Sequence, residues 1–378
     1  MKIGILTYHR SINYGAYLQS YALYKYLSNS FPHSTVEIID YHSTRAQNEE
    51  LFMLARDIKH GNINYSLRLH RMFHVLQKKL PLSKQTLVSD DLERFRKTYY
   101  GIYDVIIAGS DQIWRLNSFR GFPNAYWLPV DLGSIKLSYA ASSRSNIASV
   151  DVKTQQAIKR FLSDFKYIGV RDDITKEELG KLGNMITYKN CDPVFLYDFR
   201  ESSGNYLSVL NDRYNISHDK PIIGFMTRDE EAIKAVQNRF KDSAHYISIY
   251  IPHRSTTNSP ALTPFEFVEI ISNLDYFVTS YFHGLCFAIK GNVPVIALEK
   301  RPGEKPANSK MFDLLHTIGR TDRYLIANED EYITSLIKDI ETQLQNREES
   351  YDKGVTTLKL LSNSFISVME ELDRHYDN

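Results

Sequence analysis

Short apolar segments that alternate with helical segments constrain the fold of this chain more than any other feature. The apolar segments have strand length and cover residues 2–8, 35–41, 104–108, 136–141, 167–170, 221–226, 245–251, 276–279 and 294–298. Helix-period stretches fall between them, as over residues 14–22, 155–166 and 264–274. Strands that alternate with helices predict parallel βαβ units, so we expect an α/β fold with two Rossmann-like domains. Ligands bind at the carboxyl ends of such strands, and we expect the active site in a cleft between the domains.

Length and local composition predict the domain boundaries. At roughly 150 residues per domain, a chain of 378 residues suggests two domains. A polar stretch over residues 199–218 separates two series of strands, so we expect an N-terminal domain over residues 1–200 and a C-terminal domain over 201–345. Residues 346–378 should form one amphipathic helix that packs back on a domain. Its apolar stripe consists of Leu358, Leu361, Phe365, Val368 and Leu372.

Composition excludes several classes of protein. The 46 basic and 45 acidic residues leave no overall basic excess of the kind that nucleic-acid binding needs. The two cysteines, Cys191 and Cys286, lie far apart and match no metal-ligand spacing, so we expect no metal site. No apolar run reaches the ~18 residues that span a bilayer. The chain opens directly on a strand without a signal-peptide pattern, and we expect a cytoplasmic protein.

Residues 45–84 form a basic insertion in the N-terminal domain. Its basic residues are Arg45, Arg56, Lys59, Arg68, Arg71, Lys78, Lys79 and Lys84, against Glu49, Glu50 and Asp57. Three aromatic residues, Phe52, Tyr65 and Phe73, are interleaved. One interpretation is a helical insertion that covers the cleft or contacts an anionic membrane surface, here the inner face of the membrane. A solvated helical face is the favoured interpretation, because charge runs of this kind usually are solvated.

The strongest candidate for chemistry is the turn over residues 279–284, where a strand gives way to a helix. Backbone N–H groups at a helix start bind anions, and Ser280 and Tyr281 precede that start. The imidazole of His283 can act as a general acid or base near neutral pH. Gly284 would let the backbone approach a ligand closely. The alternative is a buried structural histidine at the helix start.

Two further turns follow strands of the N-terminal domain. The turn Asn13-Tyr14-Gly15 could present N–H donors to a phosphate or carboxylate, although it lacks the glycine pattern of a nicotinamide site. The turn Gly109-Ser110-Asp111-Gln112 offers close approach and polar groups, and Trp114 offers a platform for a sugar face. In each case a plain structural turn is the alternative, with Asp111 as a helix N-cap.

Cations also follow predicted strands. The guanidinium of Arg171 could hold a carboxylate or phosphate bidentately, unless it pairs with Asp172 or Asp173. A basic loop follows the strand over residues 294–298 and could close over an anionic ligand, with a solvated loop as the alternative. Its cations are Lys300, Arg301, Lys305 and Lys310.

Taken in order, these pieces resemble the polysaccharide pyruvyl transferase family over about residues 1–315. The matching pieces are Asn13-Tyr14-Gly15-Ala16-x-Leu18-Gln19, Gly109-Ser110-Asp111-Gln112-x-Trp114, Ser138-Tyr139-Ala140-Ala141-Ser142, Val170-Arg171-Asp172, Asp192-Pro193, Thr279-Ser280-x-Phe282-His283-Gly284 with Pro294-Val295-Ile296-Ala297, and Asn308-Ser309-Lys310. Each piece is weak by itself, whereas seven in order are specific.

The resemblance implies a GT-B-like pair of domains and an enzyme that moves pyruvate from phosphoenolpyruvate (PEP) to a sugar of a bacterial capsule or exopolysaccharide unit. A pyruvate ketal forms and phosphate leaves, with no cofactor. It also implies that His283 is the general acid at the PEP site, that Arg171 is an anion clamp and that Lys310 is a third contact. The glycan acceptor could be lipid-linked. We add Asp111 as a group that orients or activates the acceptor, because the reaction needs a base as well as an acid.

The full set of expected substrate-binding residues follows from these turns. It comprises Asn13, Tyr14, Gly15, Gly109, Ser110, Gln112, Trp114, Arg144, Ser280, Tyr281, Gly284 and Lys310. One position departs from the family pattern, because several members carry Arg two residues before the motif histidine, where this chain has Tyr281. Either that anion contact is missing, or another cation replaces it. The candidates are Arg144, Arg171, Arg301 and Lys310.

Two other functions fit the same pattern. A GT-B glycosyltransferase would use the same helix starts to bind the diphosphate of a nucleotide sugar, since a fold alone does not determine a function. A non-catalytic partner in a glycan pathway would explain the Tyr281 departure and the basic insertion.

Overall fold

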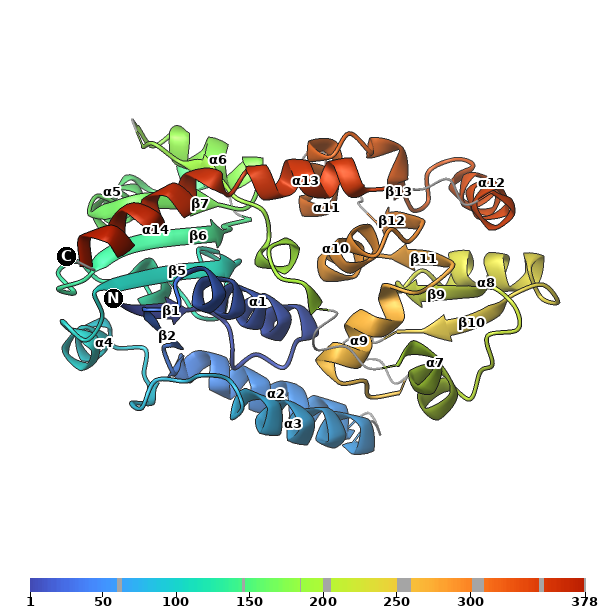
Figure 1. Cartoon of the computed structure of the whole chain (residues 1–378), viewed down its shortest axis with the longest axis horizontal. Coiled ribbons are helices and arrows are strands. Elements are labelled where there is room, and N and C mark those ends of the chain that lie inside the picture. The colour runs from blue at the N-terminus through green and yellow to red at the C-terminus, as the bar shows by residue number, and fades with distance from the viewer. Residues whose placement is uncertain are drawn as a thin grey trace. The chain divides into compact units, whose positions relative to one another are not determined.

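The computed structural model describes residues 1–59, 63–144, 147–183, 185–199, 205–249, 260–300, 309–346 and 350–376. The chain divides into two compact units, Met1–Tyr197 with Lys359–Asn378, and Asp198–Leu358. Each unit is built on its own sheet with helices packed around it (Figure 1). All strand pairs in the described part of the chain are parallel, which confirms the predicted α/β class.

The sheet of the first unit has the strand order β2-β1-β5-β6-β7-β8. Its strands are β1 (Lys2–Leu6), β2 (Thr35–Ile38), β5 (Val105–Asp111), β6 (Ile135–Ala141), β7 (Phe165–Val170) and β8 (Tyr188–Lys189). The predicted strand over residues 35–41 is interrupted: β2 ends at Ile38, and β3 (Tyr41–His42) pairs with β4 (Leu87–Val88) in a separate two-stranded sheet. The central strands are apolar and buried on both faces, as expected where helices cover both sides.

Helices connect the strands of the first unit. They are α1 (Tyr14–Ser30), α2 (Thr44–Lys59), α3 (Ile63–Gln77), α4 (Leu92–Tyr99), α5 (Val152–Leu162) and α6 (Asp173–Gly180). Several begin at an Asn or Asp whose side chain accepts a backbone N–H of the first turn, among them Asn13, Asp151 and Asp172. The basic insertion is helical as expected and forms the hairpin of α2 and α3.

The sheet of the second unit has the strand order β10-β9-β11-β12-β13. Its strands are β9 (Ile222–Met226), β10 (His245–Ser248), β11 (Tyr276–Thr279), β12 (Val295–Glu299) and β13 (Tyr324–Ile326). Its helices are α7 (Tyr206–Val209), α8 (Glu230–Arg239), α9 (Pro264–Ile271), α10 (Phe282–Lys290), α11 (Lys310–Thr317), α12 (Tyr332–Gln345) and α13 (Asp352–Leu360). Thr263 and Glu266 form a capping box at the start of α9, which fixes that helix where the sequence placed it.

The C-terminal segment forms two helices in place of the single helix predicted over residues 346–378. The helix is interrupted after α13 at residues 361–362, and α14 (Asn363–Tyr376) lies along β6 and β7 of the first unit (Figure 1). Ser362 lies at the break, where its hydroxyl is 2.8 Å from the hydroxyl of Tyr139 on β6. The ring of Phe365 packs edge-on against Tyr139 at a centroid distance of 4.7 Å and is fully buried. The apolar stripe of α14 therefore completes the core of the first unit.

The substitution Phe365→Ala should destabilise the first unit strongly. Removal of a fully buried aromatic side chain costs about 3–5 kcal/mol, because the surrounding residues refill the cavity only in part. Leu360→Ala is the matched control, since that side chain on α13 is 59% exposed. Thermal unfolding followed by circular dichroism should show a lower transition temperature for Phe365→Ala alone. Equal transition temperatures for the two variants would contradict this packing.

Candidate functional site

The order of the strands defines one special point in each sheet. After β1 the chain first adds β2 on one side and later adds β5 on the other, so a crevice opens between β1 and β5 at their carboxyl ends. The same reversal occurs between β9 and β11 in the second unit. The predicted turns lie at these two points. Thr7 follows β1 and donates to the carbonyl of Ser110 at 3.4 Å, while the hydroxyls of Thr227 and Ser280 lie 2.7 Å apart beyond β9 and β11.

In the second unit, His283 and Lys310 lie beside the same ring. Helix α10 begins at Phe282, three residues beyond the last residue of β11. The centroids of the Phe282 and His283 rings are 5.4 Å apart, and Nζ of Lys310 is 5.0 Å from the Phe282 centroid. Lys310 is the first residue of α11, so two helix starts meet here, and both histidine and lysine side chains are partly exposed. A cation, an imidazole and two helix N-termini suit an anionic ligand.

Ser309 fixes the start of α11 at this edge. Its hydroxyl accepts the backbone N–H groups of Met311 and Phe312 and bonds to the carboxylate of Glu299 at the end of β12. Tyr324 of β13 donates to the same carboxylate at 2.7 Å. The bonds of Ser309 therefore hold the adjacent Lys310 at the carboxyl edge of the sheet.

Three other predicted residues of this turn have structural partners. The hydroxyl of Ser280 bonds to the carbonyl of Leu298 and to Thr227, so it joins the ends of three strands. Tyr281 is the N-cap residue of α10, and its backbone N–H donates to Thr279 at 3.1 Å. A Cβ on Gly284 would lie 2.7 Å from Oγ1 of Thr279. The glycine therefore lets α10 pack closely on β11, which corrects the expectation that it makes room for a ligand.

In the first unit, Arg171 is the centre of a buried ion cluster. Its guanidinium lies 3.1 Å from a carboxylate oxygen of Asp192 and 3.7 Å from one of Asp111. The side chains of Arg171 and Asp192 are 3% and 1% exposed, whereas that of Asp111 is 19% exposed. Burial by itself lowers the pKa of Arg171, but the nearby carboxylates of Asp111, Asp192 and Asp172 outweigh it and raise that pKa. Of the alternative partners considered in the sequence, Asp172 acts on Arg171 electrostatically while capping α6, and Asp173 forms an ion pair with Lys189.

Residues 109–111, predicted as a turn, form the end of β5, where the chain passes close to β6. Gly109 has φ of +132°, and a Cβ there would lie 2.0 Å from the carbonyl oxygen of Tyr139, so only glycine fits. Ser110 is buried, and its hydroxyl has no hydrogen-bond partner among the described residues. The backbone N–H of Gln112 donates to Asp111 at 2.7 Å. These contacts hold the carboxylate of Asp111 at the exposed end of the ion cluster.

Trp114 does not provide a sugar platform. Its indole is fully buried and stacks on Trp127 at a centroid distance of 5.3 Å, and its N–H donates to the carbonyl of Tyr126. Trp114 belongs to a buried core cluster that includes Trp127 and Tyr126, and the partly buried Phe165 contacts its ring edge-on. Trp114 therefore has a structural role in the core of the first unit.

At the predicted turn Asn13-Tyr14-Gly15, two of the three residues are buried in the first turn of α1. The side chain of Asn13 is exposed and accepts the N–H of Ala16, which makes it the N-cap of α1. The ring of Tyr14 is 2% exposed and packs against Phe73 of α3, so it joins α1 to the helical hairpin and does not face a ligand. Gly15 is buried in the first turn of α1. Arg144 is exposed at the end of the segment that follows β6.

Two residues of these edges carried no role in the sequence analysis. Asp192 is the buried ion-pair partner of Arg171 and the N-cap of a short helical turn. In the sequence it is marked only by the Asp192-Pro193 pair. Thr227 follows β9 in the same way as Ser280 follows β11. Both depend on contacts between distant segments, which a local pattern does not contain.

Comparison with known proteins identifies the family. The sequence pattern of the polysaccharide pyruvyl transferases matches residues 13–299. The chain belongs to the polysaccharide pyruvyl transferase family. A search of curated proteins finds no match.

Several solved structures match this chain over nearly the full length of both chains. Anabaena HepE in complex with UDP-glucose has a TM-score of 0.52 at 10% identity, with 100% of this chain and 99% of that chain covered. A UDP-N-acetylglucosamine 2-epimerase, described as putative, from Listeria monocytogenes has a TM-score of 0.55 at 11% identity, with 100% and 96% covered. The epimerase of Neisseria meningitidis has a TM-score of 0.52 at 9% identity, with 98% and 100% covered. These likenesses confirm the GT-B-like fold of this pyruvyl transferase family member.

The buried ion cluster should behave as one unit in stability measurements. Arg171→Met leaves the buried carboxylate of Asp192 without its cation and should cost about 3–5 kcal/mol. Asp192→Asn should cost a similar amount, and the double variant should cost clearly less than the sum of both, because the two side chains are in contact. Urea unfolding of the four proteins measures this coupling. Lys166→Met, which breaks an exposed pair with Glu371, is the control and should unfold as the unmodified protein does. Additive effects at Arg171 and Asp192 would contradict the cluster.

Proposed function

We propose that this family member transfers the pyruvyl group of PEP to a sugar of a bacterial capsule or exopolysaccharide unit. The observation that carries the proposal is the position of His283 and Lys310, both beside the Phe282 ring at two helix starts on one sheet edge, in a chain of this family. PEP carries a phosphate and a carboxylate, so its site needs fixed cations and aligned N–H groups. A ligand of this charge matches that edge of the second unit.

The reaction requires one proton transfer to carbon and one to the released phosphate. A general acid protonates the methylene carbon of PEP, which leaves an oxocarbenium-like centre at the carbon that bears the phosphate. One sugar hydroxyl attacks that carbon, the bond to the phosphate oxygen breaks, and a second hydroxyl closes the ketal. The two hydroxyls lose two protons, of which one replaces the proton given to the new methyl group and the other accompanies phosphate. We assign the acid to His283.

Lys310 is our candidate for the cation that replaces the missing arginine at Tyr281. Its ammonium lies over the Phe282 ring, next to the histidine of the same turn. Arg171 and Arg144 belong to the first unit, and Arg301 lies outside the described residues. A lysine binds phosphate as a point charge, so this substitution keeps the charge and loses bidentate geometry.

In the first unit we propose that Asp111 orients or activates the sugar hydroxyl. Its carboxylate is the more exposed of the two that contact Arg171. Because Asp111 and Asp192 already balance the guanidinium, we assign Arg171 to positioning Asp111 in place of clamping PEP. The remaining polar residues expected at this edge are Asn13 and Arg144, which are exposed, and Gln112, which is partly exposed; they stay proposed contacts of the glycan.

PEP should raise the melting temperature of the purified protein. A ligand at one hundred times its dissociation constant stabilises the folded state by about 2.7 kcal/mol, which corresponds to several degrees. Lys310→Ala should reduce this shift, because it removes a cation from the site. His283→Ala should retain the fold and most of the shift but lose the release of phosphate from PEP in the presence of a glycan acceptor.

His218→Ala is the matched control for the histidine, because His218 precedes β9 at the opposite edge of the same sheet. It should leave both the shift and phosphate release unchanged. UDP-sugars are tested in parallel, because similar folds have been solved in complex with UDP-sugars. A shift in melting temperature with UDP-sugars alone would support the glycosyltransferase alternative. Full activity of His283→Ala would remove the assigned acid. No turnover with any donor would favour the non-catalytic partner.

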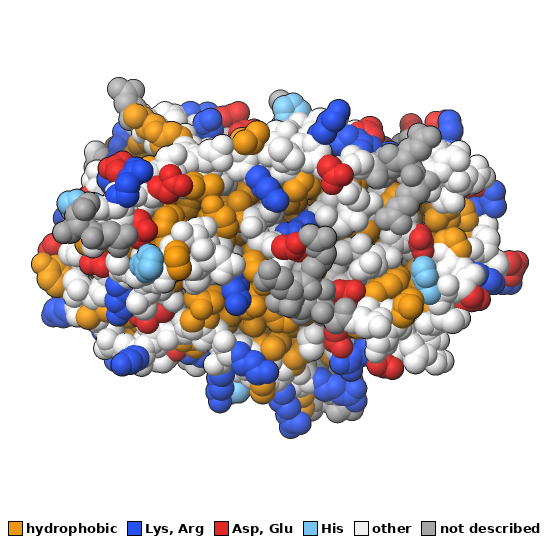
Figure 2. Space-filling view, in the orientation of Figure 1, with side chains coloured by type: hydrophobic (Ala, Val, Ile, Leu, Met, Phe, Trp, Pro, Cys, Tyr) orange, Lys and Arg blue, Asp and Glu red, His pale blue; other side chains and the backbone are white. Residues whose placement is uncertain are grey.

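We further propose that the acceptor is lipid-linked and that the hairpin of α2 and α3 contacts an anionic membrane. None of the helices in the described residues is long and apolar enough to cross a bilayer. Lys and Arg gather along the lower edge of the molecule in Figure 2, where Figure 1 places this hairpin. Leu51, Phe52 and Val75 are more than half exposed on the same helices. Cations beside exposed apolar side chains suit an anionic lipid surface.

The protein should float with phosphatidylglycerol vesicles in low salt and should not float with phosphatidylcholine vesicles. Replacement of Arg68, Arg71, Lys78 and Lys79 by Gln should abolish flotation, since each cation near such a surface contributes about 1 kcal/mol. Replacement of Lys234 and Lys338, which lie on helices of the second unit, is the control and should not affect it. Binding to both kinds of vesicle, or no binding to either, would contradict the membrane contact.

A further inference from the structure

A pocket of about 320 Å³ lies in the first unit beside the turn that follows β1. Its walls come from the residues after β1, from β3 and from both helices of the hairpin, so it belongs to one unit. Pockets that hold small ligands have volumes of roughly 300–1,000 Å³, and this one therefore suits a single small ligand. Residues 13–15, 109–112 and 279–284 are not among those that line it.

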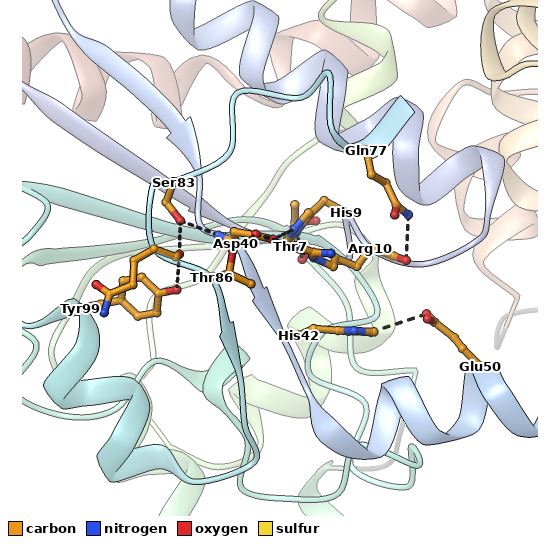
Figure 3. A network of polar contacts seen from close by, with 11 residues as sticks. Thr7, His9, Arg10, Asp40, His42, Glu50, Gln77, Ser83, Thr86 and Tyr99 are labelled. Carbon is orange, nitrogen blue, oxygen red and sulfur yellow. Dashed lines mark hydrogen bonds and ion pairs between the residues drawn. The ribbon is translucent and has the colours of Figure 1, made fainter. Parts of the chain in front are cut away.

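An ion network holds one wall of the pocket rigidly (Figure 3). The guanidinium of Arg10 donates two hydrogen bonds to the carboxylate of Asp40, at 2.7 and 2.5 Å. His9 and Thr86 bond to the same carboxylate, at 3.1 and 2.6 Å. Although burial raises the pKa of Asp40, these hydrogen bonds hold it well below its usual range, so Asp40 is charged and balances Arg10. Gln77 of α3 donates to the carbonyl of Arg10 at 2.9 Å and fixes the hairpin to this wall.

His42 contributes a buried polar atom to the pocket. Its side chain is only 9% exposed, and Nε2 has no hydrogen-bond partner among the residues that the structure describes. The nearest carboxylate oxygen, on Glu50 of α2, lies 3.6 Å away, and Figure 3 shows the two side chains facing each other. A buried polar group without a partner costs about 1–3 kcal/mol, so a ligand that supplies the partner gains that amount. A hydroxyl group placed near Nε2 and the carboxylate could bond to both.

The charges and residue types of the pocket select the class of ligand. Asp40 neutralises Arg10, and Glu50 adds a negative charge, so the pocket has no excess cation for a phosphate or carboxylate. No group of His, Cys, Asp and Glu in the described part of the chain has the geometry of a metal site. The other lining residues include amides and imidazoles, which donate and accept hydrogen bonds, and Leu51 and Ile12, which can contact C–H groups. Hydrogen-bond donors and acceptors around a small volume match a sugar ring.

We propose that this pocket binds one neutral sugar residue of the acceptor glycan. The inference deepens the proposed function and rests on it in one respect, since it takes the ligand to be part of the pyruvyl acceptor. His42 and Glu50 would hold the hydroxyl groups, and the Arg10–Asp40 pair would keep the wall in place. The pocket then determines which glycan is accepted, separately from the residues assigned to PEP.

Saturation-transfer NMR with the full-length protein tests the proposal without PEP. The probes are the neutral methyl pyranosides of glucose, galactose, mannose and N-acetylglucosamine, each titrated separately, with inorganic phosphate as the anionic probe. At least one glycoside should bind. Its affinity should fall about tenfold or more in His42→Phe, which keeps a ring and removes Nε2, and in Glu50→Gln. Glu49→Gln, one residue away on α2, should leave the affinity unchanged.

Three results would overturn the proposal: no binding of any glycoside, binding that both variants retain, or phosphate binding that displaces the glycoside. The PEP-induced shift in melting temperature is measured on the same variants and should persist in both. Loss of glycoside binding with an unchanged PEP-induced shift therefore assigns the effect to this pocket alone. Absence of a PEP-induced shift in the unmodified protein would contradict PEP as the donor and would leave the pocket proposal to the glycoside titration.

Discussion

The parallel pairing of β1 with β5 and of β9 with β11 is the constraint on which the rest of the structure depends. Parallel strands direct all their carboxyl ends to one edge, and the reversal of strand order opens a crevice at these two pairs. The residues with proposed roles lie at these ends or in the segments that follow them. The helices that follow contribute their N-terminal N–H groups to the same edges.

The two edges differ in the chemistry that they offer. The first unit presents a carboxylate, because Arg171 is enclosed by Asp111 and Asp192 and only Asp111 reaches solvent. The second unit presents an imidazole and an ammonium next to Phe282. A carboxylate suits a hydroxyl group, and cations suit PEP. This division of charge is the physical reason to assign acceptor activation to one edge and donor binding to the other.

Much of the fold was predictable from the sequence, because strand-length apolar runs and helix caps are local signals. The capping box at Thr263 and the strand over residues 276–279 are examples. The break before α14 was not predictable, since it depends on Ser362 meeting Tyr139 more than two hundred residues away. The site residues divide in the same way. His283 and Lys310 follow strand ends and were found, whereas the burial of Trp114 and Tyr14 and the pairing of Arg171 with Asp192 result from tertiary contacts. Gly109 and Gly284 were predicted to admit a ligand, but Gly109 instead packs closely on the backbone of Tyr139 and Gly284 on the side chain of Thr279.

The most direct test of the central claim is the fate of the PEP methylene group. The protein is incubated in D2O with PEP and a lipid-linked glycan fraction, and the glycan product is analysed by NMR. The account predicts a pyruvate ketal whose methyl group carries one deuteron from the solvent, with an equal amount of phosphate released. A product without deuterium in that methyl group, or transfer of a sugar from a nucleotide donor with PEP left intact, would contradict it.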